Sequence, residues 1–227
     1  MKSNYRYIVK AFMAMAVIAG TTSCDDFLDR EPMSSISPET YYSTAAQLEA
    51  NLNDEYPNVL PSFGQWTYGI FGEDKGTDNQ IEVNANDRYT QDRWKVPHSE
   101  SDNWKFERIY RINFFLSEAL PKFGEDMSGS QNTISGSVAT IKHYIGEMYF
   151  LRAYEYFKKL QLFGDFPIIN QPLADEMEAL REASKRFPRN EVARFILEDL
   201  DKAISYLASR GKFNGQRVNR EAALLFK

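Results

Sequence analysis

One stretch of the chain interleaves aromatic side chains with hydrogen-bonding ones, the combination that suits a sugar ligand. Between residues 63 and 94 it carries the five candidates Trp66, Asp78, Tyr89, Arg93 and Trp94. Aromatic rings can cover the apolar face of a sugar, and carboxylates or guanidinium groups can bond its hydroxyls. We therefore predict that these residues bind a glycan. The alternative is that the aromatic rings pack on the fold while the charges stay solvated.

Two sets of carboxylates could instead indicate catalysis. Glu147 and Glu155 flank Arg152 in an otherwise apolar segment, and acids at positions 73, 74 and 78 resemble the paired carboxylates of glycoside hydrolysis. An arginine in an apolar helix needs a carboxylate partner, and Glu155 follows Arg152 by three residues on the same helix face. We expect a structural ion pair between them, with Glu147 less well aligned. Acids on a loop are more often solvated or accept hydroxyl groups, so we expect no catalytic residue and no enzyme.

The sequence gives little support for a metal, a cofactor or a nucleic-acid partner. His98 and His143 are isolated in the sequence, and Cys24 is the single cysteine. We find no glycine-rich phosphate loop and no serine–histidine–aspartate pattern. The net charge of −5 argues against binding to nucleic acid.

The N-terminus has the organisation of a lipoprotein leader. Three basic residues precede an apolar run over 11–20, and small residues then lead to Cys24. The run is far shorter than the roughly 20 residues that span a bilayer. We expect residues 1–23 to be a signal peptide, Cys24 to carry the lipid, and 24–38 to form a tether before the helical part, 39–227. The alternative is a soluble secreted protein in which this cysteine has no role.

Hydrophobic periodicity and capping residues predict an all-α fold, because no segment alternates as a half-buried strand does. Residues 57–101 and 167–187 are predicted to be connections between helices. A connection as long as the first more often has a function than serves only to join two helices. Apolar residues of the last expected helix still recur where the sequence stops, so we expect this sequence to be the N-terminal part of a longer protein. Small residues at Ala153, Ala203 and Ala222 favour close antiparallel pairs of the tetratricopeptide type. The expected helices cover 39–53, 102–120, 137–163 and 188–207, with a further one after Asn219.

Five sequence blocks resemble, in order, those of the SusD/RagB outer-membrane lipoproteins of Bacteroidota. The most specific block is Gly-Glu-Met-Tyr-Phe-Leu-Arg-Ala-Tyr-Glu-Tyr-Phe over 146–157, followed by Phe-Gly-Asp-Phe-Pro over 163–167. The other four are Cys-Asp-Asp-Phe-Leu-Asp at 24–29, Phe-x-x-Ile-x-x-x-Asn at 106–113, an arginine-to-leucine block at 189–207 and Arg-Val-Asn-Arg-Glu-Ala-Ala at 217–223.

The resemblance implies a helical protein with tetratricopeptide-like pairs on the outer face of the outer membrane. It implies a cap on a SusC-type TonB-dependent transporter that captures an oligosaccharide or another large nutrient. It also places Glu147, Arg152 and Glu155 in core motifs, away from the ligand. Two alternatives stay open at this point: a lipid-anchored helical-repeat scaffold that binds only protein, and a surface glycosidase.

Overall fold

The computed structural model describes residues 41–61, 103–124 and 126–227. These residues form helices and, apart from two isolated bridges (Thr44 with Ser135 and Phe166 with Phe187), show no β-structure. None of the helices they form is long and apolar enough to cross a bilayer. The helices are α4 (Ala45–Val59), α5 (Glu107–Phe123), α6 (Val138–Phe163), α7 (Met177–Ala183), α8 (Arg189–Tyr206), the 3₁₀ turn η2 (Arg210–Phe213) and α9 (Arg220–Phe226).

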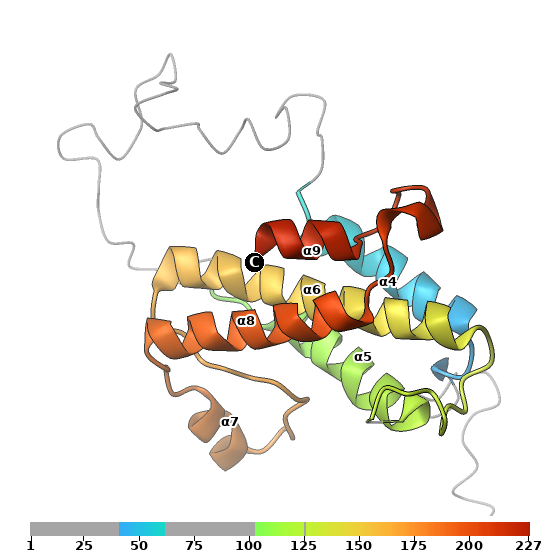
Figure 1. Cartoon of the computed structure of the whole chain (residues 1–227). Coiled ribbons are helices and arrows are strands. Elements are labelled where there is room, and N and C mark those ends of the chain that lie inside the picture. The colour runs from blue at the N-terminus through green and yellow to red at the C-terminus, as the bar shows by residue number, and fades with distance from the viewer. Residues whose placement is uncertain (1–40, 62–102, 125) are drawn as a thin grey trace, which may run out of the picture. The chain divides into compact units, whose positions relative to one another are not determined.

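Helix α6 is the centre of the helical array, with α4, α5 and α8 packed against it and α9 packed against α8 (Figure 1). Because neighbours cover it on several sides, more than half of its residues are buried, which is typical of a central helix. It begins after Ser137 and ends at Gly164, where φ is +70°, as the sequence predicts.

Helices α6 and α8 form the antiparallel pair that the small residues predict (Figure 1). Ala153 and Ala203 are fully buried in the core. Gly146 allows the two helices to approach, since a Cβ there would lie 2.9 Å from Cβ of Tyr206 and 3.1 Å from the backbone nitrogen of Leu207. In α9, however, it is Ala223 rather than Ala222 that is buried.

Helices α4 and α5 each continue past a proline, a residue that usually ends a helix. Helix α4 passes through Pro57 to Val59, and α5 passes through Pro121 to Phe123. Val59 and Phe123 are buried in the core, so packing holds the last turn although each proline removes one helical hydrogen bond. At the other end, α4 begins at Ala45 behind a capping box formed by Thr44 and Gln47. The predicted helix start at residue 39 lies outside the described residues.

The connection 167–187 contains a helix that periodicity does not indicate. Helix α7 has no buried residue and stands apart from the central helices (Figure 1). A helix without a buried stripe has no apolar repeat to detect. The predicted start of α9 is confirmed, because the side chain of Asn219 accepts a hydrogen bond from the N–H of Ala222 at 3.0 Å.

Candidate functional site

A buried ion pair between Arg152 and Asp199 joins α6 to α8. Nε and one terminal nitrogen of Arg152 donate to the two carboxylate oxygens at 2.6 and 2.8 Å, the bidentate geometry of a strong pair. Burial alone lowers the pKa of Arg152, but the hydrogen bonds and charge of Asp199 outweigh it and hold that pKa above its usual value. The prediction that Arg152 needs an acid is confirmed. The predicted partner Glu155 is wrong, because the acid comes from the neighbouring helix.

The other donors of Arg152 organise the chain that follows α6. Its second terminal nitrogen donates to the side-chain oxygen of Asn113 at 2.9 Å and to the carbonyl of Asn170 at 3.2 Å. Asn113 in turn donates to the carbonyl of Ile169, which also accepts from the Tyr156 hydroxyl at 3.0 Å. This network fixes α5, α6, α8 and the start of the connection relative to one another.

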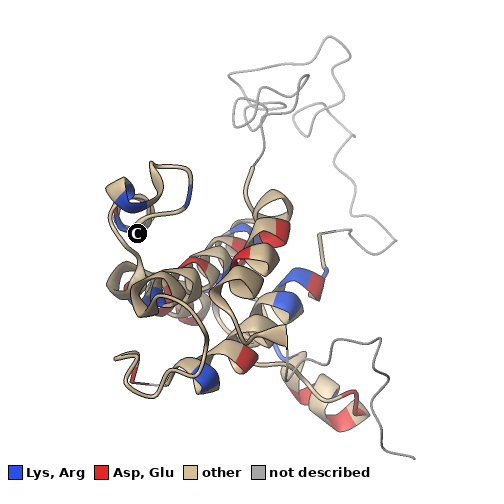
Figure 2. Ribbon diagram, turned by 90° about the vertical axis from the view of Figure 1, so that its right-hand side faces the viewer, with Lys and Arg blue, Asp and Glu red and all other residues tan. Residues whose placement is uncertain are grey.

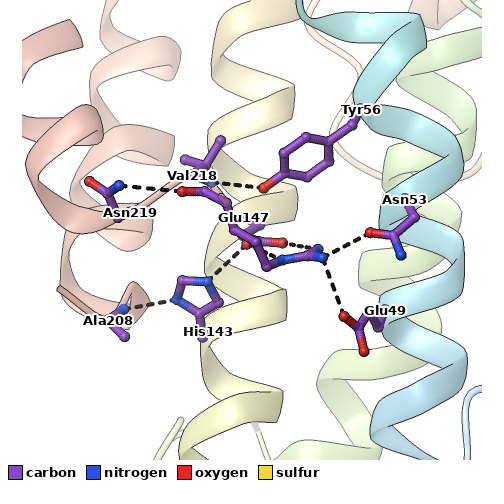
Figure 3. Close-up of polar contacts among 9 residues, drawn as sticks. Glu49, Asn53, Tyr56, His143, Glu147, Ala208, Val218 and Asn219 are labelled. Carbon is purple, nitrogen blue, oxygen red and sulfur yellow. Dashed lines mark hydrogen bonds and ion pairs between the residues drawn. The ribbon is translucent and has the colours of Figure 1, made fainter. Parts of the chain in front are cut away.

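A second buried acid, Glu147, accepts two hydrogen bonds from Arg217 at 2.8 and 2.6 Å (Figure 3). Nε2 of His143 lies 2.8 Å from the same carboxylate. Nδ1 of that ring accepts the N–H of Ala208 at 2.9 Å, which leaves the proton of the neutral imidazole on Nε2. Arg217 also donates to Asn53 of α4 at 2.8 Å. His143 therefore lies within a structural network linking α4, α6 and the segment before α9.

A third acid of α6, Glu155, is buried among cations. Its side chain is 3% exposed, and its carboxylate oxygens lie 2.7 Å from Nζ of Lys158 and 3.3 Å from Nζ of Lys159. Arg108 of α5 approaches it to 4.0 Å. The carboxylates at 147 and 155 thus lie in separate networks, and each is paired with cations.

Two cavities lie beside these networks. One of about 320 Å³ adjoins Glu155 between α5 and the C-terminal half of α6, and another of about 400 Å³ adjoins Arg152 between α5 and α8. The described residues around the first are Asn103, Lys105, Glu107, Arg108, Glu155, Lys158, Lys159 and Leu162. The second is bordered by polar groups such as Ser117, Gln171 and Glu198 and by the rings of Tyr149 and Phe195. It therefore offers aromatic rings beside hydrogen-bonding groups.

The five predicted glycan-binding residues, Trp66, Asp78, Tyr89, Arg93 and Trp94, lie outside the described residues, as do Cys24 and His98. The third tryptophan, Trp104, is described. Its ring packs edge-on against Phe163 at 4.8 Å and Phe166 at 4.9 Å. The described part of the chain holds no group of three or more histidines and acids placed to bind a metal. Figure 2 shows acidic and basic residues interspersed over the described helices.

Residues 26–226 match the profile of a family described as "SusD-like", "Starch-binding associating with outer membrane". The chain belongs to this SusD-like family. SusD-like protein P2 of Formosa agariphila is 26% identical over 214 residues, which cover 89% of this chain and 38% of that protein. SusD-like protein P38 of the same organism is 24% identical, over 88% of this chain and 37% of that protein. The chain thus spans less than two fifths of the length of these relatives.

Solved SusD-like structures share the fold. A SusD-like protein from Bacteroides fragilis superposes with a TM-score of 0.53 at 19% identity, over 87% of this chain and 36% of that one. A SusD-like carbohydrate binding protein from the same species gives 0.53 at 20% identity, over 82% and 37%. The family resemblance and the all-α SusD-like fold are therefore confirmed.

The most specific sequence block, residues 146–157, lies on α6. The SusD-like block over 146–157 contains Gly146, Glu147 and Arg152, which respectively allow α8 to approach, bind Arg217 and bind Asp199. These residues therefore act within the packed helices of this SusD-like chain. Sequence spacing does not indicate Asp199 or Arg217 as the partners, although both lie in blocks that resemble the family.

Proposed function

We propose that this chain is part of a surface lipoprotein that binds an oligosaccharide and delivers it to a SusC-type TonB-dependent transporter. The observation that carries the proposal is the family match over residues 26–226, whose description names starch binding and the outer membrane. The aromatic and polar residues between 63 and 94 support it, since they offer both stacking faces and hydrogen-bonding groups. The proposed role is capture and transfer, without catalysis, cofactor or metal.

In the proposed mechanism, Trp66, Tyr89 and Trp94 stack on sugar rings while Asp78 and Arg93 bond the hydroxyl groups. Such contacts are individually modest; even a pair of aromatic rings gains only about 0.5 to 1.5 kcal/mol beyond the area it buries. Several together favour a chain of sugars over a single one. The ligand class is therefore an oligosaccharide.

Titration of the full-length protein with plant, host and microbial glycans, followed by tryptophan fluorescence and calorimetry, tests the binding role. We expect saturable binding without product release, weakened roughly tenfold by Trp94→Ala, which corresponds to about 1.4 kcal/mol. Tyr206→Phe is the control, because Tyr206 lies at the end of α8, packs against Tyr149 with ring centroids 5.9 Å apart, and keeps an aromatic ring as phenylalanine. Binding of no glycan would overturn the oligosaccharide role and favour a protein-binding scaffold; release of shortened glycans would favour a glycosidase.

The anchor is proposed from the leader: residues 1–23 as signal peptide, Cys24 as the lipidated residue, 24–38 as tether and 39–227 as the helical part. Radiolabelled palmitate should label the wild-type protein, and Cys24→Ser should abolish the labelling and release the protein from the outer membrane. Affinity purification from cells should recover a TonB-dependent transporter. Labelling that survives Cys24→Ser would refute the assigned anchor.

A further inference from the structure

Two adjacent lysines of α6 bind the two ends of the chain that connects α4 to α5. Nζ of Lys158 donates to the carbonyl of Val59, the last residue of α4, at 2.9 Å. Nζ of Lys159 donates to the carbonyl of Asn103, shortly before α5, at 2.7 Å. Consecutive residues of one helix therefore hold the point where the connection leaves and the point where it returns.

Glu155 joins the two lysines into one cluster. It lies one helical turn before them, so the three side chains reach the same side of α6. Each lysine is paired with this carboxylate, and Glu155 and Lys159 are both buried, at 2% and 6% exposure. A buried ion pair holds its geometry because neither partner can be released without leaving an unpaired charge.

Apolar packing secures the same two points. Val59 is 3% exposed and belongs to the core. Trp104, directly after Asn103, packs on the aromatic rings of Phe163 and Phe166 around the end of α6. Both ends are thus held by a hydrogen bond to a lysine and by burial of the residue itself or of its neighbour.

We infer that Glu155, Lys158 and Lys159 form a positioning clamp, which fixes both ends of the connection carrying the candidate glycan-binding residues. This inference rests on the proposed function for its effect on ligand. Fixing the ends of a connection reduces the conformational entropy that ligand binding would otherwise have to overcome, so the clamp raises affinity without contacting the sugar.

Hydrogen–deuterium exchange of the full-length protein tests the clamp without any ligand. Lys158→Met should raise exchange at least fivefold in peptides covering 54–61, at the end of α4. Lys159→Met should do so in peptides covering 103–108. Exchange in α8 should not change in either variant. Lys142→Met is the matched control, because Lys142 lies near the start of the same helix, several turns before the clamp lysines, over the ring of Tyr206. Equal effects at both ends from each variant, or none, would overturn the clamp.

The affinity for a glycan then tests the expected consequence of the clamp for ligand binding. With a glycan that the wild-type protein binds, each of the two clamp variants should weaken binding roughly tenfold, while Lys142→Met leaves it within twofold. Unchanged affinity in a variant with raised end-specific exchange would refute the link to ligand. If the wild-type protein binds no glycan, the proposed function fails, whereas the exchange experiment still decides whether the clamp exists.

Discussion

Arg152 and Glu147 are buried ions on α6 whose partners come from elsewhere in the chain. Asp199 of α8 neutralises Arg152, and Arg217 neutralises Glu147. A buried pair of this kind contributes little net stability compared with apolar residues of the same shape, but losing one partner leaves the other charge unpaired. These residues therefore constrain which helices pack together more than they add to the free energy of folding.

Asp199→Asn should reveal this constraint, because it keeps the side-chain shape but removes the charge facing Arg152. We expect the free energy of unfolding to fall by about 3 to 5 kcal/mol. Urea titration followed by circular dichroism measures the change. Asp201→Asn, two residues away in an exposed pair with Lys227, should cost less than about 1 kcal/mol. Equal losses in the two variants would show that burial of the Arg152 pair is unimportant.

At the residue scale, the sequence predicts that Arg152 is paired but not with which residue. Helical spacing reports only neighbours on the same helix, which is why it selects Glu155. Asp199 becomes a neighbour only when α8 packs antiparallel to α6, a tertiary contact that single-helix spacing does not contain. For the same reason, helical spacing does not identify Arg217 as the partner of Glu147.

At the element scale, helix boundaries set by local chemistry are predictable, and those set by packing are not. Gly164 ends α6 with a positive φ, and Asn219 caps α9 with its side chain, as their residue types indicate. Ser137 occupies the N-cap position of α6, although its side chain makes no capping hydrogen bond. Pro57 and Pro121 do not end their helices at once, because buried residues two positions later hold the final turn. Helix α7 has no buried residue, so it gives no periodic signal.

Gly146→Ala should separate the α6–α8 packing from helix propensity. Alanine favours a helix over glycine by up to about 1 kcal/mol, but its Cβ would clash with Tyr206 and the backbone of Leu207. We expect a net loss of about 1 to 2 kcal/mol in thermal or urea unfolding. Gly211→Ala is the control, since an added Cβ there meets nothing within 4 Å. A stabilised Gly146→Ala variant would show that the two helices can separate at no cost.

At the scale of the whole molecule, three ionic networks of α6 connect parts far apart in sequence. One links α4 to the segment before α9, and one links α5 to α8 and to the connection that follows α6. The third holds both ends of the connection between α4 and α5. The fold class and the central helix follow from sequence pattern, whereas this connectivity does not. The candidate ligand residues stay a prediction, because they lie outside the described residues.

Buried tyrosines should make the folded protein sensitive to alkali. Burial is the main cause that raises the pKa of Tyr149 from 10 to about 12, and it raises that of Tyr42 likewise. A phenol with a raised pKa favours the folded state below pH 10, and that stability is lost as the pH rises towards 12. Tyr149→Phe removes one such group while keeping the aromatic ring that Arg152 and Lys202 both approach.

The free energy of unfolding should therefore fall less steeply between pH 10 and 12 in Tyr149→Phe than in the wild-type protein. The difference in slope should reach at most about 1.4 kcal/mol per pH unit, the value for one proton. Lysines also titrate in this range, but they are common to both proteins and cancel in the comparison. Urea titrations at each pH give the two slopes, and phenolate absorbance at 295 nm gives the ionisation directly. Parallel slopes would mean that Tyr149 ionises in the folded protein as readily as in the unfolded chain.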